Sequence, residues 1–324
     1  MSWPDLTLVP EGVVTAVAWR AGGAPSQTVR FLENGVAYVR SDEVERELRR
    51  FIHEVLDRLE ESGRKTALSE EWSAVTAMDE QEAAFARAAA RLGLDPYSLP
   101  ESVADDIVAI SEELDVELLD EFLDSANPTS LRTAVQWLTQ AREVVREVAV
   151  SEPIDDLRRE LHTGNQPVPY LRGYALAREL RRKLDLSPTE PVDLAPLVSN
   201  AVLQTPSGGL EGFVRADDHV RLVLPGAELS PSAVRFAEGR SLGLALAGSR
   251  SDYLLDPART DSMKQARAFA AELLAPAEGI ATFLAELPAS TDAAFEAIAR
   301  RFQASALLVR RQYENQLSAG HAFD

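Results

Sequence analysis

Histidine and cysteine, the side chains that most often bind transition metals or act as nucleophiles, are scarce in this sequence. The absence of cysteine excludes thiolate metal sites, cysteine nucleophiles and disulfides. No two of the four histidines are spaced i and i+4, as a helical metal-binding pair requires. They are His53, His162, His219 and His321. His219 follows two aspartates and is a candidate surface cation site, although a solvent-exposed turn is the simpler interpretation.

Carboxylates, in contrast, are abundant: the formal net charge is −19. The 33 residues from Leu92 to Asp124 contain eleven acids and no Lys or Arg. Such a surface disfavours direct nucleic-acid binding. Two interpretations remain open: a docking face for a basic partner (or a DNA mimic), and a solvated helix face that aids solubility. The candidate partner-binding residues are Asp105, Asp106, Glu112, Glu113, Asp115, Glu117, Asp120 and Glu121.

The elements that carry these residues begin with strands. Residues 13–19, 28–32 and 36–39 have β character, and Asn34-Gly35 between the last two is a strong hairpin signal. The first forty residues therefore predict a β-meander of two or three strands.

Helical periodicity follows the strands. Apolar residues at helical spacing predict helices over residues 41–62, 80–92, 102–122 and 129–148, with Ser41 as a candidate N-cap. The third of these helices has one apolar stripe, opposite its acids. The stripe comprises Val103, Ile107, Ile110, Leu114, Leu118 and Phe122.

A Pro- and Gly-containing stretch between residues 150 and 165 is the predicted domain boundary, separating an N-terminal domain (1–150) from a C-terminal one (165–324). Beyond it we expect helices at 173–184, 194–198, 231–247, 261–274, 292–302 and 305–317, and strands at 201–204, 210–214 and 220–224. No apolar run approaches the roughly 18 residues of a membrane span. The N-terminus has neither a basic leader nor an apolar segment. We therefore expect a cytoplasmic protein.

The C-terminal half resembles the ImmA/IrrE-type zinc metallopeptidases, a zincin-like family. The resemblance covers roughly 150 residues. It rests on five segments in order: residues 173–184, Leu210-Glu211-Gly212-Phe213, Arg235-Phe236-Ala237, residues 268–276, and Phe302-Gln303-Ala304-Ser305.

The resemblance implies a zinc site whose ligands are missing here. The zinc helix of the family reads H-E-x-x-H, with a Glu from the next helix as third ligand. On this sequence the first His falls at Arg240, the Glu at Ser241 and the second His at Leu244. The third ligand falls within about one residue of Gln265. A guanidinium repels Zn²⁺, Ser241 has no carboxylate, and Leu244 has no ligand atom.

The sequence thus predicts an α+β fold that is mainly α. We expect an N-terminal β-meander with helices, followed by a zincin-like domain of helices and a small sheet. The implied function is that of a bacterial pseudo-peptidase without cofactor, which binds a protein partner such as a basic or helix-turn-helix regulator. The alternative is an active zinc metallo-endopeptidase with an unorthodox metal site.

Overall fold

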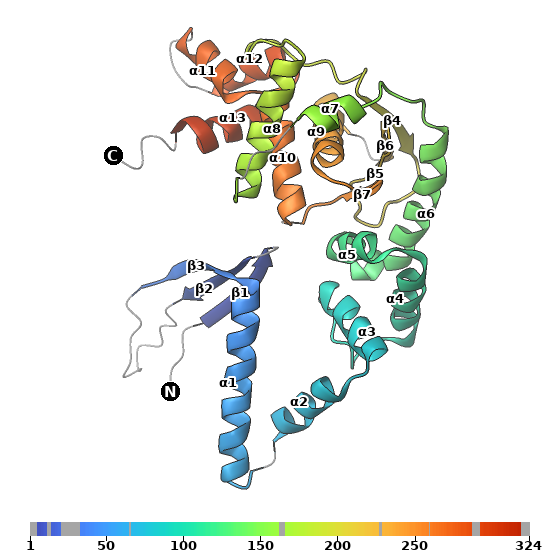
Figure 1. The fold of residues 1–324 in the computed structure, drawn as a ribbon, viewed down its shortest axis with the longest axis vertical. Coiled ribbons are helices and arrows are strands. Elements are labelled where there is room, and N and C mark those ends of the chain that lie inside the picture. Colours follow the sequence, from blue (N-terminus) through green and yellow to red (C-terminus); the bar gives the residue numbers. More distant parts are fainter. Residues whose placement is uncertain are drawn as a thin grey trace. The chain divides into compact units, whose positions relative to one another are not determined.

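The computed structural model confirms a mainly helical α+β fold (Figure 1). It describes residues 5–11, 14–20, 33–64, 66–161, 166–226, 229–258, 260–286 and 292–318. The chain divides into two compact units. Unit 1 comprises Met1–Ala84 with Arg259–Asp261, and unit 2 comprises Phe85–Ala258 with Ser262–Asp324.

Unit 1 opens with the predicted meander. Strands β1 (Asp5–Glu11), β2 (Val14–Arg20) and β3 (Gly35–Arg40) form an antiparallel sheet in the order β1-β2-β3. The predicted strand at 28–32 lies outside the described residues. Gly35 is required by a close approach, because a Cβ at this position would lie 2.2 Å from the indole of Trp19.

Two helices complete unit 1. The predicted first helix is α1 (Ser41–Glu61), although Arg40 occupies the N-cap position and the Ser41 hydroxyl bonds to the hydroxyl of Thr15 instead. The second, α2 (Ala67–Ala77), was not predicted. The imidazole of His53 packs edge-on against Trp72, with ring centroids 5.5 Å apart, and this contact joins the two helices.

Unit 2 begins within α3 (Glu80–Arg91), the first helix of a layer that continues with α4 (Glu101–Glu113), α5 (Val116–Ser125), a 3₁₀ turn (Pro128–Ser130) and α6 (Leu131–Glu147). The prediction of one helix over residues 102–122 was wrong, because the chain breaks at Leu114. Asp115 then caps α5, its carboxylate accepting from the N–H of Leu118 at 2.9 Å. The predicted apolar stripe is correct, because its members pack in one core cluster.

The second half supplies a mixed sheet and the helices around it. The strands β4 (Val198–Leu203), β5 (Gly212–Ala216), β6 (Val220–Pro225) and β7 (Asp252–Leu255) lie in the order β4-β6-β5-β7, with β4 parallel to β6 and the other pairs antiparallel. The helices are α7 (Asp155–Glu160), α8 (Pro169–Lys183), α9 (Pro231–Ala247), α10 (Asp261–Leu274), α11 (Ala277–Ala285), α12 (Asp292–Phe302) and α13 (Ala306–Tyr313), followed by a π-helical turn (Glu314–Ser318). Strand β7 and helices α7 and α11 were not predicted, and the helix expected at 194–198 is a turn leading into β4.

This sheet is buried on both faces. Phe213, Val223 and Leu254 point into a core shared with α3–α6, while their neighbours Val214 and Leu222 point into a core shared with α8, α9 and α10. Because successive side chains of a strand point to opposite faces of the sheet, each strand packs against a helical layer on either side. Residues 85–147 pack on the C-terminal sheet, so the division between the units lies near residue 84, not in the predicted boundary at 150–165.

Contrary to the expectation from the sequence, one apolar stretch of the described chain is long enough to cross a membrane. Within the described chain, Asp261–Ala285 passes this test by length and composition alone. Pro276 interrupts it between α10 and α11, and 67% of its most apolar window is buried inside the structure. This burial is typical of the core of a soluble protein.

Candidate functional site

Helix α9 carries three of the four positions at which the resemblance places zinc chemistry. Ser230 caps it by accepting from the N–H of Ala233 at 3.2 Å, and Pro231 occupies its first turn. Gly243 lets α10 approach closely, because a Cβ there would lie 2.7 Å from the ring of Phe269. The Leu-Gly pair at 242–243 thus has a packing role that is independent of catalysis.

Arg240 occupies the first position and is 5% exposed. Its Nη1 donates to the carboxylate of Glu211, which precedes β5, and its Nη2 donates to the main-chain oxygen of Asp256 at 2.7 Å. The same nitrogen lies 3.5 Å from the sulfur of Met263 on α10. An ion pair thus lies where the family has a metal ligand.

Glu272 of α10 does not pair with Arg240. The carboxylate of Glu272 accepts from Nε of Arg178 at 2.7 Å, and from the side-chain amides of Gln312 and Gln316 at 2.9 and 2.8 Å. It therefore joins α8, α10 and the C-terminal helices on another side of α10.

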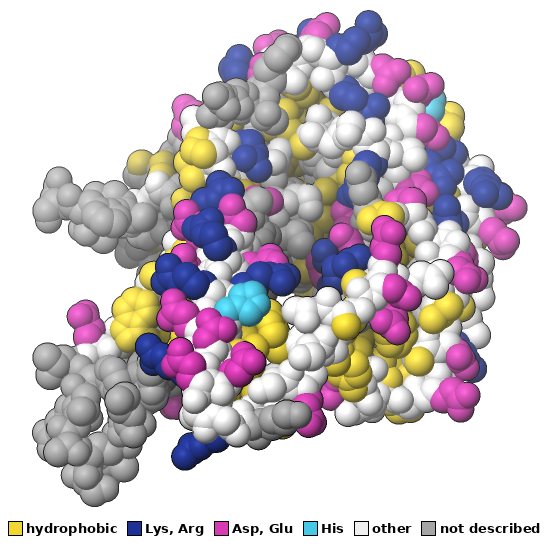
Figure 2. Space-filling model, turned by 60° about the horizontal axis from the view of Figure 1, so that its bottom comes forward, with side chains coloured by type: hydrophobic (Ala, Val, Ile, Leu, Met, Phe, Trp, Pro, Cys, Tyr) yellow, Lys and Arg dark blue, Asp and Glu magenta, His cyan; other side chains and the backbone are white. Residues whose placement is uncertain are grey.

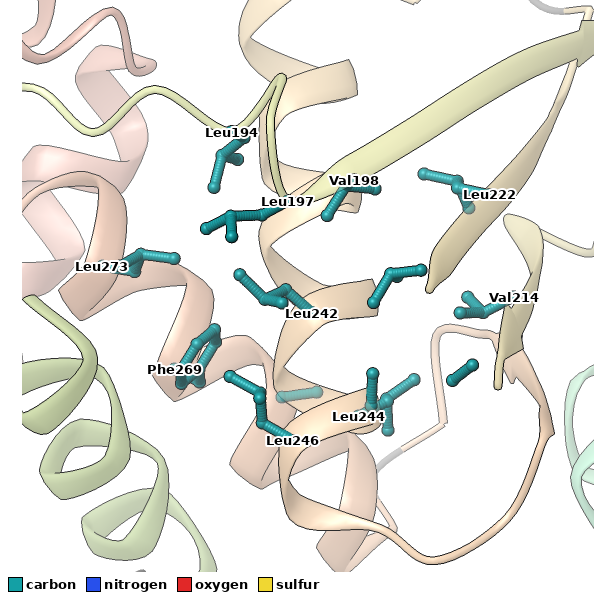
Figure 3. Close-up of a cluster of buried hydrophobic side chains, with 14 of the residues drawn as sticks. Leu194, Leu197, Val198, Val214, Leu222, Leu242, Leu244, Leu246, Phe269 and Leu273 are labelled. Atoms are coloured by element: carbon teal, nitrogen blue, oxygen red, sulfur yellow. The ribbon is translucent and has the colours of Figure 1, made fainter. Parts of the chain in front are cut away.

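Ser241 and Leu244 are both internal. The hydroxyl of Ser241 donates to the carbonyl of Ala237 one turn earlier at 2.8 Å. Leu244 belongs to the core cluster, on the side of α9 toward Val214 of β5 (Figure 3). Residues 239–243 also fit the G-x-S-x-G spacing of serine hydrolases, but Ser241 lies fully buried inside a helix and not on a strand-to-helix elbow.

Gln265 does not join the other three. Nε of Arg172 on α8 donates to its Oε1 at 3.0 Å, so its side chain is held by α8. The residue of α10 that reaches Arg240 is Met263, and Arg267 shares the main-chain oxygen of Asp256 with Arg240, donating at 2.6 Å. The side chains at these positions do not fit a zinc ion, because a buried cation stands among them.

Asp256, which sequence reasoning missed, lies at the centre of this cluster. It is 1% exposed, and burial raises the pKa of its carboxyl to about 7. Its Oδ1 accepts from the N–H of Ala258 at 2.7 Å, whereas its Oδ2 and the Nε of Arg240 have no hydrogen-bond partner. No sequence motif marks an Asp that follows a short strand, so burial alone identifies it.

The edge of β7 is closed by side chains. The N–H of Glu211 donates to the carbonyl of Leu255, and the N–H of Ala216 donates to the carbonyl of Ser251. The main-chain groups of alternate residues along β7 therefore face β5. The main-chain groups of the residues between them face away from β5, and one of these, the N–H of Leu254, donates to the carboxylate of Glu121 of α5 at 3.0 Å. At residue 256, Arg240 and Arg267 take the outward carbonyl. An extended peptide cannot pair with these groups without displacing those side chains.

The acidic stretch is not a uniform free surface. Burial raises the pKa of Glu121, which also pairs with Arg250, and Asp115 caps α5. Asp106 pairs with Arg132, Asp120 and Asp124 pair with Arg91, and Glu113 accepts from Thr139. Asp105 and Glu112 are exposed, and the side chain of Glu117 lies outside the described residues. Most of the predicted docking residues thus make contacts within unit 2.

The remaining candidates are structural. At the turn of His219, Asp217 already pairs with Arg221 and accepts from the His219 N–H at 3.1 Å. His162 and His321 lie outside the described residues. Within the described ranges, no three His, Cys, Asp or Glu side chains group as a metal site. In the terminal helices Arg310 of α13 pairs with Asp292 of α12 at 2.6 Å.

No protein-family model matches the chain, and no curated protein sequence matches it significantly.

Proposed function

We propose that this chain is a catalytically degenerate ImmA/IrrE-type metallopeptidase-like protein that acts as a protein-interaction or regulatory module. The observation that carries the proposal is the environment of Arg240. A guanidinium that is 5% exposed, held by Glu211 and the main chain of Asp256, stands at the first ligand position. In this proposal a buried guanidinium, paired with a half-exposed Glu211 and hydrogen-bonded to the main chain of Asp256, occupies the place of a metal ligand.

The edge of β7 supports the same proposal. Glu121, Arg240 and Arg267 occupy outward main-chain groups along it. A peptidase needs an accessible main-chain edge or groove to hold an extended substrate. Side chains that satisfy the edge internally suit a protein that binds partners elsewhere and does not cut them.

As the resemblance implies, the partner is a protein such as a basic or helix-turn-helix regulator, and the setting is the cytoplasm of a bacterium. In this proposal the zincin-like half of unit 2 is a scaffold whose core no longer depends on metal.

Metal analysis of the purified full-length chain tests the proposal. Protein produced with zinc in the medium should contain far less than one zinc per chain, and chelator should not change its melting temperature. About one zinc per chain, lost with chelator together with stability, would overturn the proposal. That result would favour the alternative, an active metallo-endopeptidase with an unorthodox site.

A further inference from the structure

The described part of unit 1 has almost no fully buried side chain. Among its described residues, only Thr15 and Ala16 are buried, and α1 and α2 contain no buried side chain. Its large apolar side chains are more than a third exposed at Leu6, Val9, Val36, Tyr38, Leu48, Phe51 and Val75. A sheet and a helix with apolar faces are stable when those faces are covered, so this surface is suited to a partner.

The exposed surface includes a defined groove. A hollow of about 520 Å³ lies between one face of the sheet and the first turns of α1. The strands contribute Leu6, Leu8, Val17 and Val39, and α1 contributes Val44 and Leu48. Charged side chains of α1 stand at its rim. Figure 2 shows a face of the molecule on which exposed hydrophobic side chains lie among charged ones.

The net charge of α1 indicates the charge of the partner that would bind in the groove. This helix has eight acids and four arginines, a net charge of −4. Intrahelical pairs already engage some arginines: Arg49 with Glu45, and Arg50 with Glu47 and Glu54. The charged residues that line the groove are Glu43, Arg46 and Glu47, so the lining is net negative by one, within a helix of net −4, and suits a basic partner. The negative charge of the helix also repels a second copy of α1, which disfavours self-association through this groove.

Two features favour a helix over a strand as the occupant. The groove runs between a helix and a sheet face, the geometry in which amphipathic helices bind through apolar residues at i, i+3, i+4 and i+7. Edge strand β1 contains Pro10, which has no N–H, and proline on an edge opposes pairing with a further strand.

We infer that the groove of unit 1 binds an amphipathic helix whose apolar face is flanked by Lys or Arg, supplied by a partner protein. The inference deepens the proposed function and rests on it, since it names the partner chemistry of the interaction module. It also moves the docking surface from the acidic stretch of α4 and α5 to α1 and the sheet before it.

Two labelled peptides of about 18 residues test the inference, both with Leu at helical spacing, one with Lys and the other with Glu elsewhere. Fluorescence anisotropy with the full-length chain should show the Lys peptide binding at least about 10-fold more tightly. Leu6→Glu and Leu48→Glu should each weaken it by about 10-fold or more. Val116→Glu, at a position 74% exposed in unit 2, is the matched control and should bind like the parent.

Three results would overturn the inference: no binding of the Lys peptide, equal binding of both peptides, or binding that Leu6→Glu and Leu48→Glu leave unchanged. Light scattering provides a further test. A parent dimer that Leu48→Glu converts to monomer would show that a second copy occupies the groove. The zinc content of the protein is measured separately, so failure here and failure of the proposed function remain distinguishable.

Discussion

Replacing Asp256 with Asn changes how the stability of the protein depends on pH. The carboxyl is 1% exposed, and its pKa in the folded protein is about 7. An unfolded Asp has a pKa of about 3.9. Between these values the folded state holds a proton that the unfolded state lacks, so this group's contribution to stability is complete below pH 4 and is lost as the pH rises through 7.

The size of the effect follows from the two pKa values. Each pH unit in that window changes the free energy of unfolding by about 1.4 kcal/mol. About two such units lie between pH 5 and the folded pKa, so the group should lose about 2.7 kcal/mol between pH 5 and 8, most of it below pH 7. Asn keeps an oxygen for the N–H of Ala258 but does not titrate. The free energy of unfolding of the variant should therefore not fall over this pH range through residue 256. Relative to the parent, the variant should become more stable by the same amount.

Urea titrations of both proteins at pH 5, 6, 7 and 8 measure this difference. Asp105→Asn, at an exposed carboxyl of α4, is the matched control and should follow the pH dependence of the parent. If the difference between parent and Asp256→Asn is constant from pH 5 to 8, the carboxyl is not held protonated by burial, and our description of the cluster around Arg240 is wrong.

Three further substitutions test the packing. Phe269→Ala removes a fully buried ring and should cost about 3–5 kcal/mol in denaturant titrations; a loss below about 1 kcal/mol would misplace α10. Gly243→Ala puts a methyl 2.7 Å from that ring and should cost about 1–3 kcal/mol, whereas a neutral result would mean that α9 and α10 are further apart. Asp115→Ala should cost about 1 kcal/mol through the lost cap of α5, whereas Glu112→Ala should stay within about 0.5 kcal/mol; equal effects would contradict the capping role.

The elements with strong periodicity were predictable from the sequence. The apolar stripe of α4 and α5 repeats at helical spacing, and its members are buried except Val103, which is partly buried. The break at Leu114 was not predictable, because an Asp that caps a new helix fits the polar face of a continuous one equally well. Strand β7 escaped prediction because four residues are too few to show alternation.

The candidate site was predictable in part. The identity of the residues at 240, 241 and 244 indicated that none of them is a usual zinc ligand, because the donor atoms of a side chain follow from the residue type alone. The hydrogen-bond partners of those residues could not be predicted, since they depend on how the helices face one another. Gln265 turns to Arg172 of α8, and Arg240 turns to Glu211. The burial of Asp256 likewise arises only from the packed layers around β7.

Rebuilding the zinc site tests most directly the claim that a metallopeptidase scaffold survives around lost chemistry. The variant combines Arg240→His, Ser241→Glu and Leu244→His with a third ligand. Met263→Glu is the first choice, since Met263 reaches Arg240, and Gln265→Glu is the comparison. Thermal melts with and without zinc provide the readout. Zinc at a hundred times its dissociation constant should stabilise the rebuilt protein by about 2.7 kcal/mol and leave the parent unchanged. If both versions fold and neither responds to zinc, the zincin alignment is wrong.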